Sequence, residues 1–191
     1  MKKVLVILAH PNMESFCGAL ASAYEGGARE AGHEVRRLNL AQVPFAVAQN
    51  AMPDALPLEP AILSARADIT WAEHIVIVGP VWWGNWPALA TGFFERAFGA
   101  GYAMEYDHKG FPRALLSGRT AHVVSTSGAP SFVILIFFRD IPVRIMKSCI
   151  LGLCGIKAIA VSRFGAFMGK GNTAKRERML AEMKTAGKNL R

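Results

Sequence analysis

The chain has 191 residues, of which 52% are hydrophobic and 19% charged, and this balance excludes a disordered chain and predicts a single folded domain over residues 1–191. The apolar runs are too short for a membrane-spanning helix, and the opening MKKVLVILAHP has no cleavage signal of a secretory leader. The formal net charge of +8 suits an anionic small ligand, and because the charges are dispersed we expect no nucleic-acid partner.

Apolar runs alternate with helical patterns in the first half of the chain. Ser15 is expected to cap the first helix and Gly32 to end it. The pattern predicts strands at 2–10, 33–40 and 73–80, helices at 15–31 and 59–74, and a loop at 41–56.

The second half continues the alternation, with helices at 88–99, 144–155 and 173–190 and strands at 119–128 and 157–165. Strands that alternate with helices are typical of βαβ units, and strands that are apolar throughout are typical of a sheet covered on both faces. The fold class is therefore α/β, a doubly wound five-stranded parallel sheet with helices on both faces. For a chain this short we expect the strand order 2-1-3-4-5.

The three cysteines, Cys17, Cys149 and Cys154, are odd in number and form no CxxC pair. This spacing favours reduced thiols in a cytoplasmic protein and predicts neither a disulfide framework nor a metal site.

Three loops follow strands whose carboxyl ends should meet at one edge of the sheet, where such folds bind ligands. AHPNMESFCGAL (9–20) leads into a helix, whose first amides suit a phosphate, with His10 and Ser15 as further donors. PVWWGNWP (80–87) offers tryptophan faces, and STSGAPS (125–131) offers small polar groups.

A flat ring with a phosphate tail would satisfy all three loops, which describes a flavin nucleotide. The simpler alternatives are that Ser15 only caps its helix, that His10 is satisfied within its loop, and that the tryptophans fill the core or a subunit interface. Trp86 in particular can be such a plug while Trp82 and Trp83 face the ring.

The chain resembles the flavodoxin-like NAD(P)H:quinone oxidoreductases, which include the modulator-of-drug-activity and potassium-efflux ancillary proteins. The resemblance is carried by AHPNMESF (9–16), by 67–98 with its Pro-x-Trp-Trp-Gly loop, by 110–128 and by 151–165. It implies a flavodoxin-like fold and a bound FAD, with FMN as the alternative. Its cofactor-binding positions fall on His10, Ser15, Phe16, Cys17, Pro80, Val81, Trp82, Trp83, Gly84, Asn85, Thr126, Ser127 and Gly128.

The resemblance also implies a ping-pong reaction in which NADPH or NADH reduces the flavin and a quinone is then reduced, usually in a homodimer. Trp83, Ser127 and Gly128 are positioning candidates, and no side chain is assigned as an acid or base. The nicotinamide is expected in a slot bordered by Trp82, Trp83 and Trp86. The alternative function is a flavin-binding module that docks on a membrane transporter.

Three departures distinguish this chain from the family pattern. Cys17 stands where an asparagine is common, and Ala129 replaces a glycine of the third loop. The tyrosine and histidine that well-studied members place beyond this loop are absent from PSFVILIFFRD (130–140). His108 is a further candidate that would reach the site only across a dimer.

The stretch SFVILIFF (131–138) is almost entirely apolar, although it follows a polar loop. It is interpreted either as a dimer interface or core helix, or as a lid over an apolar acceptor or a patch that contacts a membrane peripherally.

Overall fold

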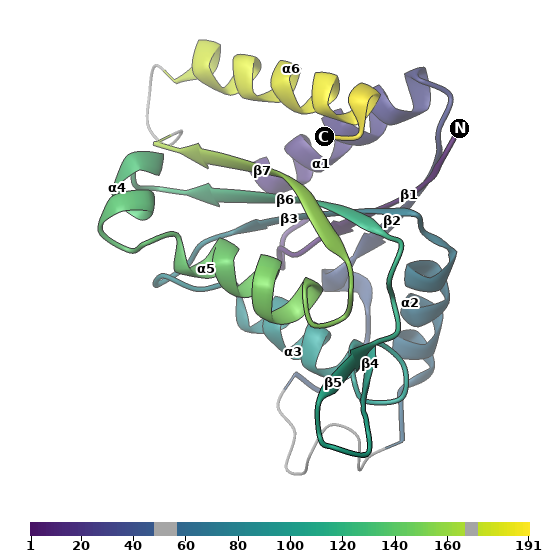
Figure 1. Ribbon diagram of the computed structural model, residues 1–191. Coiled ribbons are helices and arrows are strands. Elements are labelled where there is room, and N and C mark those ends of the chain that lie inside the picture. Colours follow the sequence, from purple (N-terminus) through teal and green to yellow (C-terminus); the bar gives the residue numbers. More distant parts are fainter. Residues whose placement is uncertain (48–56, 167–171) are drawn as a thin grey trace.

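The computed structural model describes residues 1–47, 57–166 and 172–191, so most of the loop expected at 41–56 lies outside the described residues. Five parallel strands form the central sheet in the order β2-β1-β3-β6-β7 (Figure 1). The expected order is confirmed, because the fourth and fifth predicted strands are β6 and β7. The strands are β1 (Lys3–Leu8), β2 (Glu34–Asn39), β3 (His74–Pro80), β6 (Thr120–Ser127) and β7 (Lys157–Gly165).

Helices cover both faces of the sheet, as expected. On one face lie α1 (Phe16–Glu30) and α6 (Thr173–Asn189), and on the other lie α2 (Pro60–Trp71), α3 (Ala88–Ala97) and α5 (Ile141–Arg144) (Figure 1). A short 3₁₀ turn, η1 (Leu40–Gln42), follows β2. Within the described residues no helix is both long enough and apolar enough to cross a bilayer.

The alternation of side chains along the strands explains why their sequences are apolar throughout. In β1, Leu5 and Ile7 pack into the core beneath α2 and α3, whereas Val4, Val6 and Leu8 pack into the core beneath α1 and α6. Successive strand residues point to opposite faces, so a strand covered on both sides needs apolar residues at every position.

The helix predicted at 144–155 starts earlier and is wider than an α-helix. It begins as α5 at Ile141 and continues as the π-helical segment η3 (Ile145–Leu151), where the Gly152 N–H donates to the Lys147 carbonyl at 3.0 Å. Apolar periodicity indicates a helix but does not distinguish an i→i+4 ladder from an i→i+5 ladder.

The sequence assigned no element to the region between 99 and 119, where the structure has a small hairpin. Its strands, β4 (Met104–Tyr106) and β5 (Pro112–Ala114), pair antiparallel outside the main sheet. Three-residue strands are too short to leave a periodic signal.

The apolar stretch 131–138 forms a six-residue helix, α4 (Ser131–Ile136), and none of its residues is buried. The interpretation of this stretch as a core helix is therefore wrong. The core beneath α3 is already filled by residues of β3, α3 and η3, which leaves α4 at the carboxyl ends of β6 and β7 (Figure 1).

Candidate functional site

A cavity of about 440 Å³ lies at the carboxyl ends of β1, β3 and β6. All three loops singled out in the sequence contribute to its walls. The lining residues are His10, Ser15, Phe16, Cys17, Pro80, Val81, Trp82, Thr126, Ser127 and Gly128.

The first wall is the turn between β1 and α1. Ser15 caps α1 by accepting a hydrogen bond from the Gly18 N–H at 3.2 Å, so its expected capping role is confirmed. The amides of the first helical turn cannot bond within the helix, and together with the helix dipole they favour an anion at this end of the cavity.

His10 enters the same wall as a neutral ring. Its Nδ1 accepts a hydrogen bond from the Asn12 N–H at 2.9 Å, which places the ring proton on Nε2. Partial burial holds the pKa of His10 below its usual value, which also favours the neutral form. The Nδ1 atom of His10 is thus bonded within its own loop, as one interpretation held. The Nε2–H remains as a hydrogen-bond donor.

The floor joins α1 to β6 through two buried side chains. The Cys17 Sγ lies 3.2 Å from the Thr126 Oγ1. Burial raises the pKa of the Cys17 thiol to about 11, so the group is an uncharged thiol at neutral pH. The floor of the cavity is therefore small and uncharged at this position.

The tryptophan loop is a tight turn between Trp82 and Asn85. The Trp82 N–H donates to the Asn85 carbonyl at 2.8 Å and the Asn85 N–H to the Trp82 carbonyl at 3.0 Å. The central residues Trp83 and Gly84 both have positive φ, of 52° and 75°. This is the pattern of a type I′ turn, in which glycine is favoured and tryptophan is strained.

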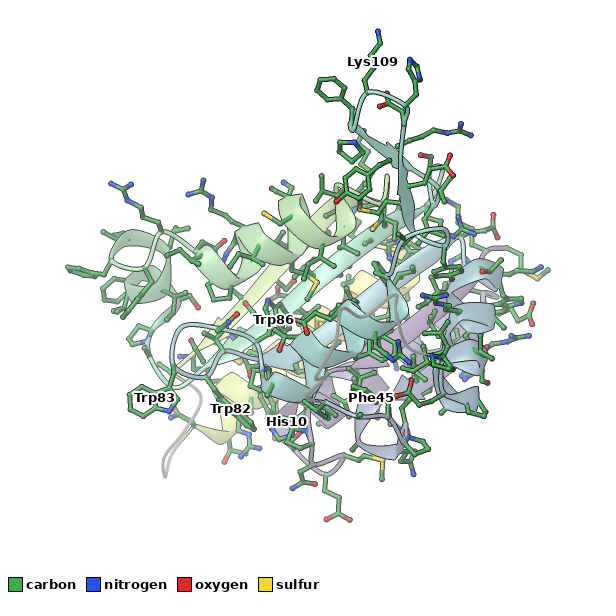
Figure 2. All side chains as sticks on the ribbon, turned by 90° about the horizontal axis from the view of Figure 1, so that it is seen from below. His10, Phe45, Trp82, Trp83, Trp86 and Lys109 are labelled. Carbon is green, nitrogen blue, oxygen red and sulfur yellow. The ribbon has the colours of Figure 1, made fainter. Side chains whose placement is uncertain are left out.

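The indole of Trp82 forms the side of the cavity beside His10. The two rings meet edge to face, with centroids 5.3 Å apart and planes at 75° (Figure 2). This contact between the first and second loops places an aromatic wall next to the histidine donor.

Trp83 and Gly84 line a second, smaller cavity of about 190 Å³. It shares Val81, Ser127 and Gly128 with the larger cavity, and Ile134 and Phe138 form its far wall. Ile134 and Phe138 were not predicted individually, but both belong to the stretch 131–138, for which one interpretation was a lid over an apolar acceptor. Asn85, although predicted, lines neither cavity, and its Oδ1 accepts the Trp86 N–H at 2.9 Å.

Trp86 does not border the slot expected for the nicotinamide. Its side chain is 4% exposed and its Nε1 donates to the Pro142 carbonyl at 2.8 Å. Trp86 is therefore a core plug between β3 and α5, whereas Trp83 is fully exposed and Trp82 is 45% exposed. Figure 2 shows this division, with Trp83 projecting outward and Trp86 within the fold.

The third loop is held by one hydrogen bond within itself and by one from the tryptophan loop. The Ser127 hydroxyl donates to the Ala129 carbonyl at 2.8 Å, and the Val81 N–H donates to the Thr126 carbonyl at 2.7 Å. The Ser127 hydroxyl proton is used within the loop. Ser127 and Gly128 can therefore donate to a ligand only through their backbone N–H groups.

The sequence did not single out Arg176 of α6 as a site residue. Its guanidinium lies 4.8 Å from the centroid of the Phe16 ring, which lines the cavity. His108, in contrast, stands in the β4–β5 loop, whose residue Lys109 projects far from Trp82 in Figure 2.

The donor set fits a flat ring with an anionic tail. The helix N-terminus and the His10 N–H lie at one end, Arg176 adds positive charge nearby, and Trp82 supplies a flat wall. Such a cavity favours an aromatic ligand that carries a phosphate, as a flavin nucleotide does.

Residues 2–186 match a family described as having a flavodoxin-like fold. An uncharacterized NAD(P)H oxidoreductase of Haemophilus influenzae is 28% identical over 172 residues, covering 84% of this chain and 82% of that protein. A ribosyldihydronicotinamide dehydrogenase-like protein of Penicillium crustosum is 26% identical over 155 residues, covering 66% of this chain. The chain spans 57% of the length of that fungal relative.

Solved structures are similar over nearly the whole chain. An NAD(P)H:quinone oxidoreductase from Methanothermobacter marburgensis superposes with a TM-score of 0.82 at 23% identity, covering 99% of this chain and 96% of that one. An FMN-dependent NADH-azoreductase from Bacillus anthracis in complex with FMN gives 0.75 at 19% identity, covering 100% and 99%. At these identities the likeness shows the shared fold.

Proposed function

This chain belongs to the family of flavodoxin-like fold proteins, and we propose that it is a flavin-dependent NAD(P)H:quinone oxidoreductase. The reaction class is supported by relatives that are named NAD(P)H oxidoreductase and quinone oxidoreductase. When bound, a flavin takes a hydride from the nicotinamide and then passes two electrons to an acceptor, in alternating half-reactions.

The proposal rests mainly on the larger cavity, which residues from all three predicted loops line together. Ten of the thirteen residues expected to bind the cofactor line it, although they come from three loops far apart in sequence. An aromatic wall beside an anion-binding helix end is the chemistry that a flavin nucleotide requires.

The chain's own residues act by position and charge in this proposal. The first turn of α1 and the His10 N–H would hold the phosphate, and Trp82 would offer a flat wall to the ring. Backbone N–H groups of Ser127 and Gly128 would stabilise negative charge on a bound flavin, as preorganised donors do in other enzymes. We assign no side chain as an acid or base.

Trp83 borders the acceptor side. It lines the smaller cavity, which adjoins the larger one at their shared lining residues Val81, Ser127 and Gly128. Nicotinamide and quinone would occupy this space in turn. The slot is bounded by Trp83, Ile134 and Phe138, and Trp86 takes no part in it.

Of the two flavins, we propose FMN. The azoreductase with the same fold is FMN-dependent and holds FMN, whereas nothing comparable supports FAD, the cofactor expected from the sequence resemblance. The cytoplasm is the proposed location, since the described cysteines are all unpaired, as in a reducing compartment. A homodimer belongs to the proposal too, and light scattering of the purified protein tests it.

The first experiment is a visible spectrum after incubation with FMN or FAD and desalting, followed by anaerobic addition of NADPH or NADH. We expect a retained flavin band that bleaches with the reduced nicotinamide and returns when a soluble quinone is added. Trp83→Ala should keep the band and lose most of the quinone turnover, and His10→Ala should weaken flavin retention.

A retained band that neither nicotinamide bleaches would contradict the enzyme and favour the flavin-binding module. If neither flavin is retained, the assignment of the cavity is wrong. Normal quinone turnover in Trp83→Ala would contradict the placement of the acceptor.

A further inference from the structure

A continuous apolar surface lies beside the smaller cavity. We name it the α4 patch, and its members are between 47% and 75% exposed: Phe132, Leu135, Ile136, Phe137 and Phe138. Scattered apolar side chains are ordinary on protein surfaces, but a contiguous cluster marks a surface that another body covers. Phe138 joins the patch to the smaller cavity, which it lines together with the fully exposed Trp83.

The chain next to the patch is strongly basic. Arg139, Arg144 and Lys147 are exposed on the segment that follows α4. Between residues 129 and 166 the one acidic residue is Asp140, and it is buried. Its Oδ2 accepts a hydrogen bond from the Arg163 Nε at 2.9 Å, so its charge is already neutralised within the fold.

The positive charge beside the patch distinguishes between the two partners that could cover it, a second copy of the chain or a lipid membrane. In a twofold dimer built on the α4 patch, the same cations of both copies would approach one another, and this segment has no exposed carboxylate to neutralise them. Anionic lipid headgroups would neutralise them, while the acyl boundary accepts phenyl and aliphatic side chains. We infer that the α4 patch docks this protein on the surface of an anionic lipid membrane.

Docking in this orientation also indicates which class of quinone the protein reduces. This step rests on the proposed function. Because Trp83 and Phe138 are both exposed and both line the smaller cavity, that cavity reaches the surface at the patch. A quinone with a long apolar tail partitions into a bilayer and would pass from the lipid into this cavity without crossing water. Figure 2 shows Trp83 at the same edge of the molecule as α4.

The test is co-sedimentation of the purified protein with vesicles, without nicotinamide or quinone. We expect binding to vesicles of phosphatidylcholine and phosphatidylglycerol, weak binding to phosphatidylcholine alone, and release by added salt. Phe137→Ser should lower the partition coefficient about ten-fold. Arg144→Gln and Lys147→Gln should each lower it roughly five-fold on the anionic vesicles.

Matched controls come from the β4–β5 hairpin, whose loop points away from the patch (Figure 2). Phe111, which is 66% exposed, is as accessible as the patch residues, and Lys109 is exposed too. Phe111→Ser and Lys109→Gln should bind vesicles as the unchanged protein does. Circular dichroism of each variant confirms that it is folded.

Three outcomes would overturn the inference: no binding of the unchanged protein to anionic vesicles, equal losses in the control variants, or a change from dimer to monomer in Phe137→Ser without a change in vesicle binding. The last would assign the patch to a second copy of the chain. Since no turnover is measured, the two proposals fail separately. If the protein reduces a soluble quinone but does not sediment with vesicles, the proposed function stands and the membrane-docking surface is wrong. If it sediments with vesicles but reduces no quinone, only the membrane-docking surface stands.

Discussion

The thiol of Cys17 lies 3.2 Å from the hydroxyl of Thr126, and this contact joins the first turn of α1 to the end of β6. Both side chains are 2% exposed, so neither can turn to water for another partner. The contact therefore ties together two of the three loops that form the cavity.

Replacing Cys17 by valine should remove this partner and leave the Thr126 hydroxyl buried without a hydrogen bond. Such a group costs about 1–3 kcal/mol, so we expect Cys17→Val to lower the free energy of unfolding by about 1 kcal/mol or more. Urea denaturation measures it. Cys17→Ser, which keeps a hydrogen-bonding group, should lose less, and equal stability of the valine variant would show that the contact contributes nothing.

The three thiols should react at very different rates. Burial raises the pKa of both Cys17 and Cys154 to about 11, so only about one thiol in ten thousand is ionised at neutral pH, and both are shielded. Cys149 is exposed. Iodoacetamide applied to the folded protein should therefore label Cys149 first, as peptide mass spectrometry would show. Labelling of Cys17 at the rate of Cys149 would contradict the buried floor of the cavity.

Trp83 occupies a backbone conformation that favours asparagine or glycine. Its φ of 52° costs a bulky residue about 1 kcal/mol or more. Because its side chain is fully exposed, no packing offsets this strain, and we expect Trp83→Asn to raise the midpoint of urea unfolding while quinone turnover falls. A variant with lower stability would mean that the indole makes contacts that compensate for the turn.

Stability should fall as the pH drops from about 6.5 towards 4. His74 and His122 are buried and neutral, and desolvation lowers the pKa of His74 to about 3 and that of His122 to about 4. The His74 ring bonds the Tyr24 hydroxyl at 3.0 Å and the Thr120 hydroxyl at 2.7 Å.

In this pH range the unfolded chain, in which the histidine pKa is about 6.5, binds more protons than the folded chain. Each histidine should then cost about 1 kcal/mol of unfolding free energy per pH unit below 6.5, and neither should contribute a slope above it. Urea titrations at several pH values measure the slope. His122→Gln should make it shallower, and an unchanged slope would show that His122 is already protonated in the fold.

Local patterns in the sequence were sufficient to predict the architecture. The runs KKVLVILAH and EHIVIVGP are apolar at every position, which is physically reasonable only for strands covered on both faces, and the structure has β1 and β3 there. Ser15 and Gly32 mark the ends of α1, since capping depends on neighbouring residues alone. Residues at the ends of parallel strands meet at one edge, so the three loops of the cavity were also predictable.

The fate of individual side chains depended on tertiary packing. The sequence does not distinguish the three tryptophans of this loop. In the structure Trp82 lines the cavity, Trp83 is fully exposed, and Trp86 is buried and donates to the Pro142 carbonyl. Arg176, far along the chain, reaches Phe16 because α6 packs against α1, where Gly27 leaves room for the Lys184 carbonyl.

The same distinction applies to α4. Its sequence is as apolar as a core helix, yet it is exposed because the space beneath the sheet is filled by other elements. The sequence by itself therefore determined the elements, their order and the edge at which a ligand would bind, since these follow from local periodicity and strand order. Only the tertiary structure decided which apolar and charged side chains are buried, because burial depends on what other segments occupy the same space.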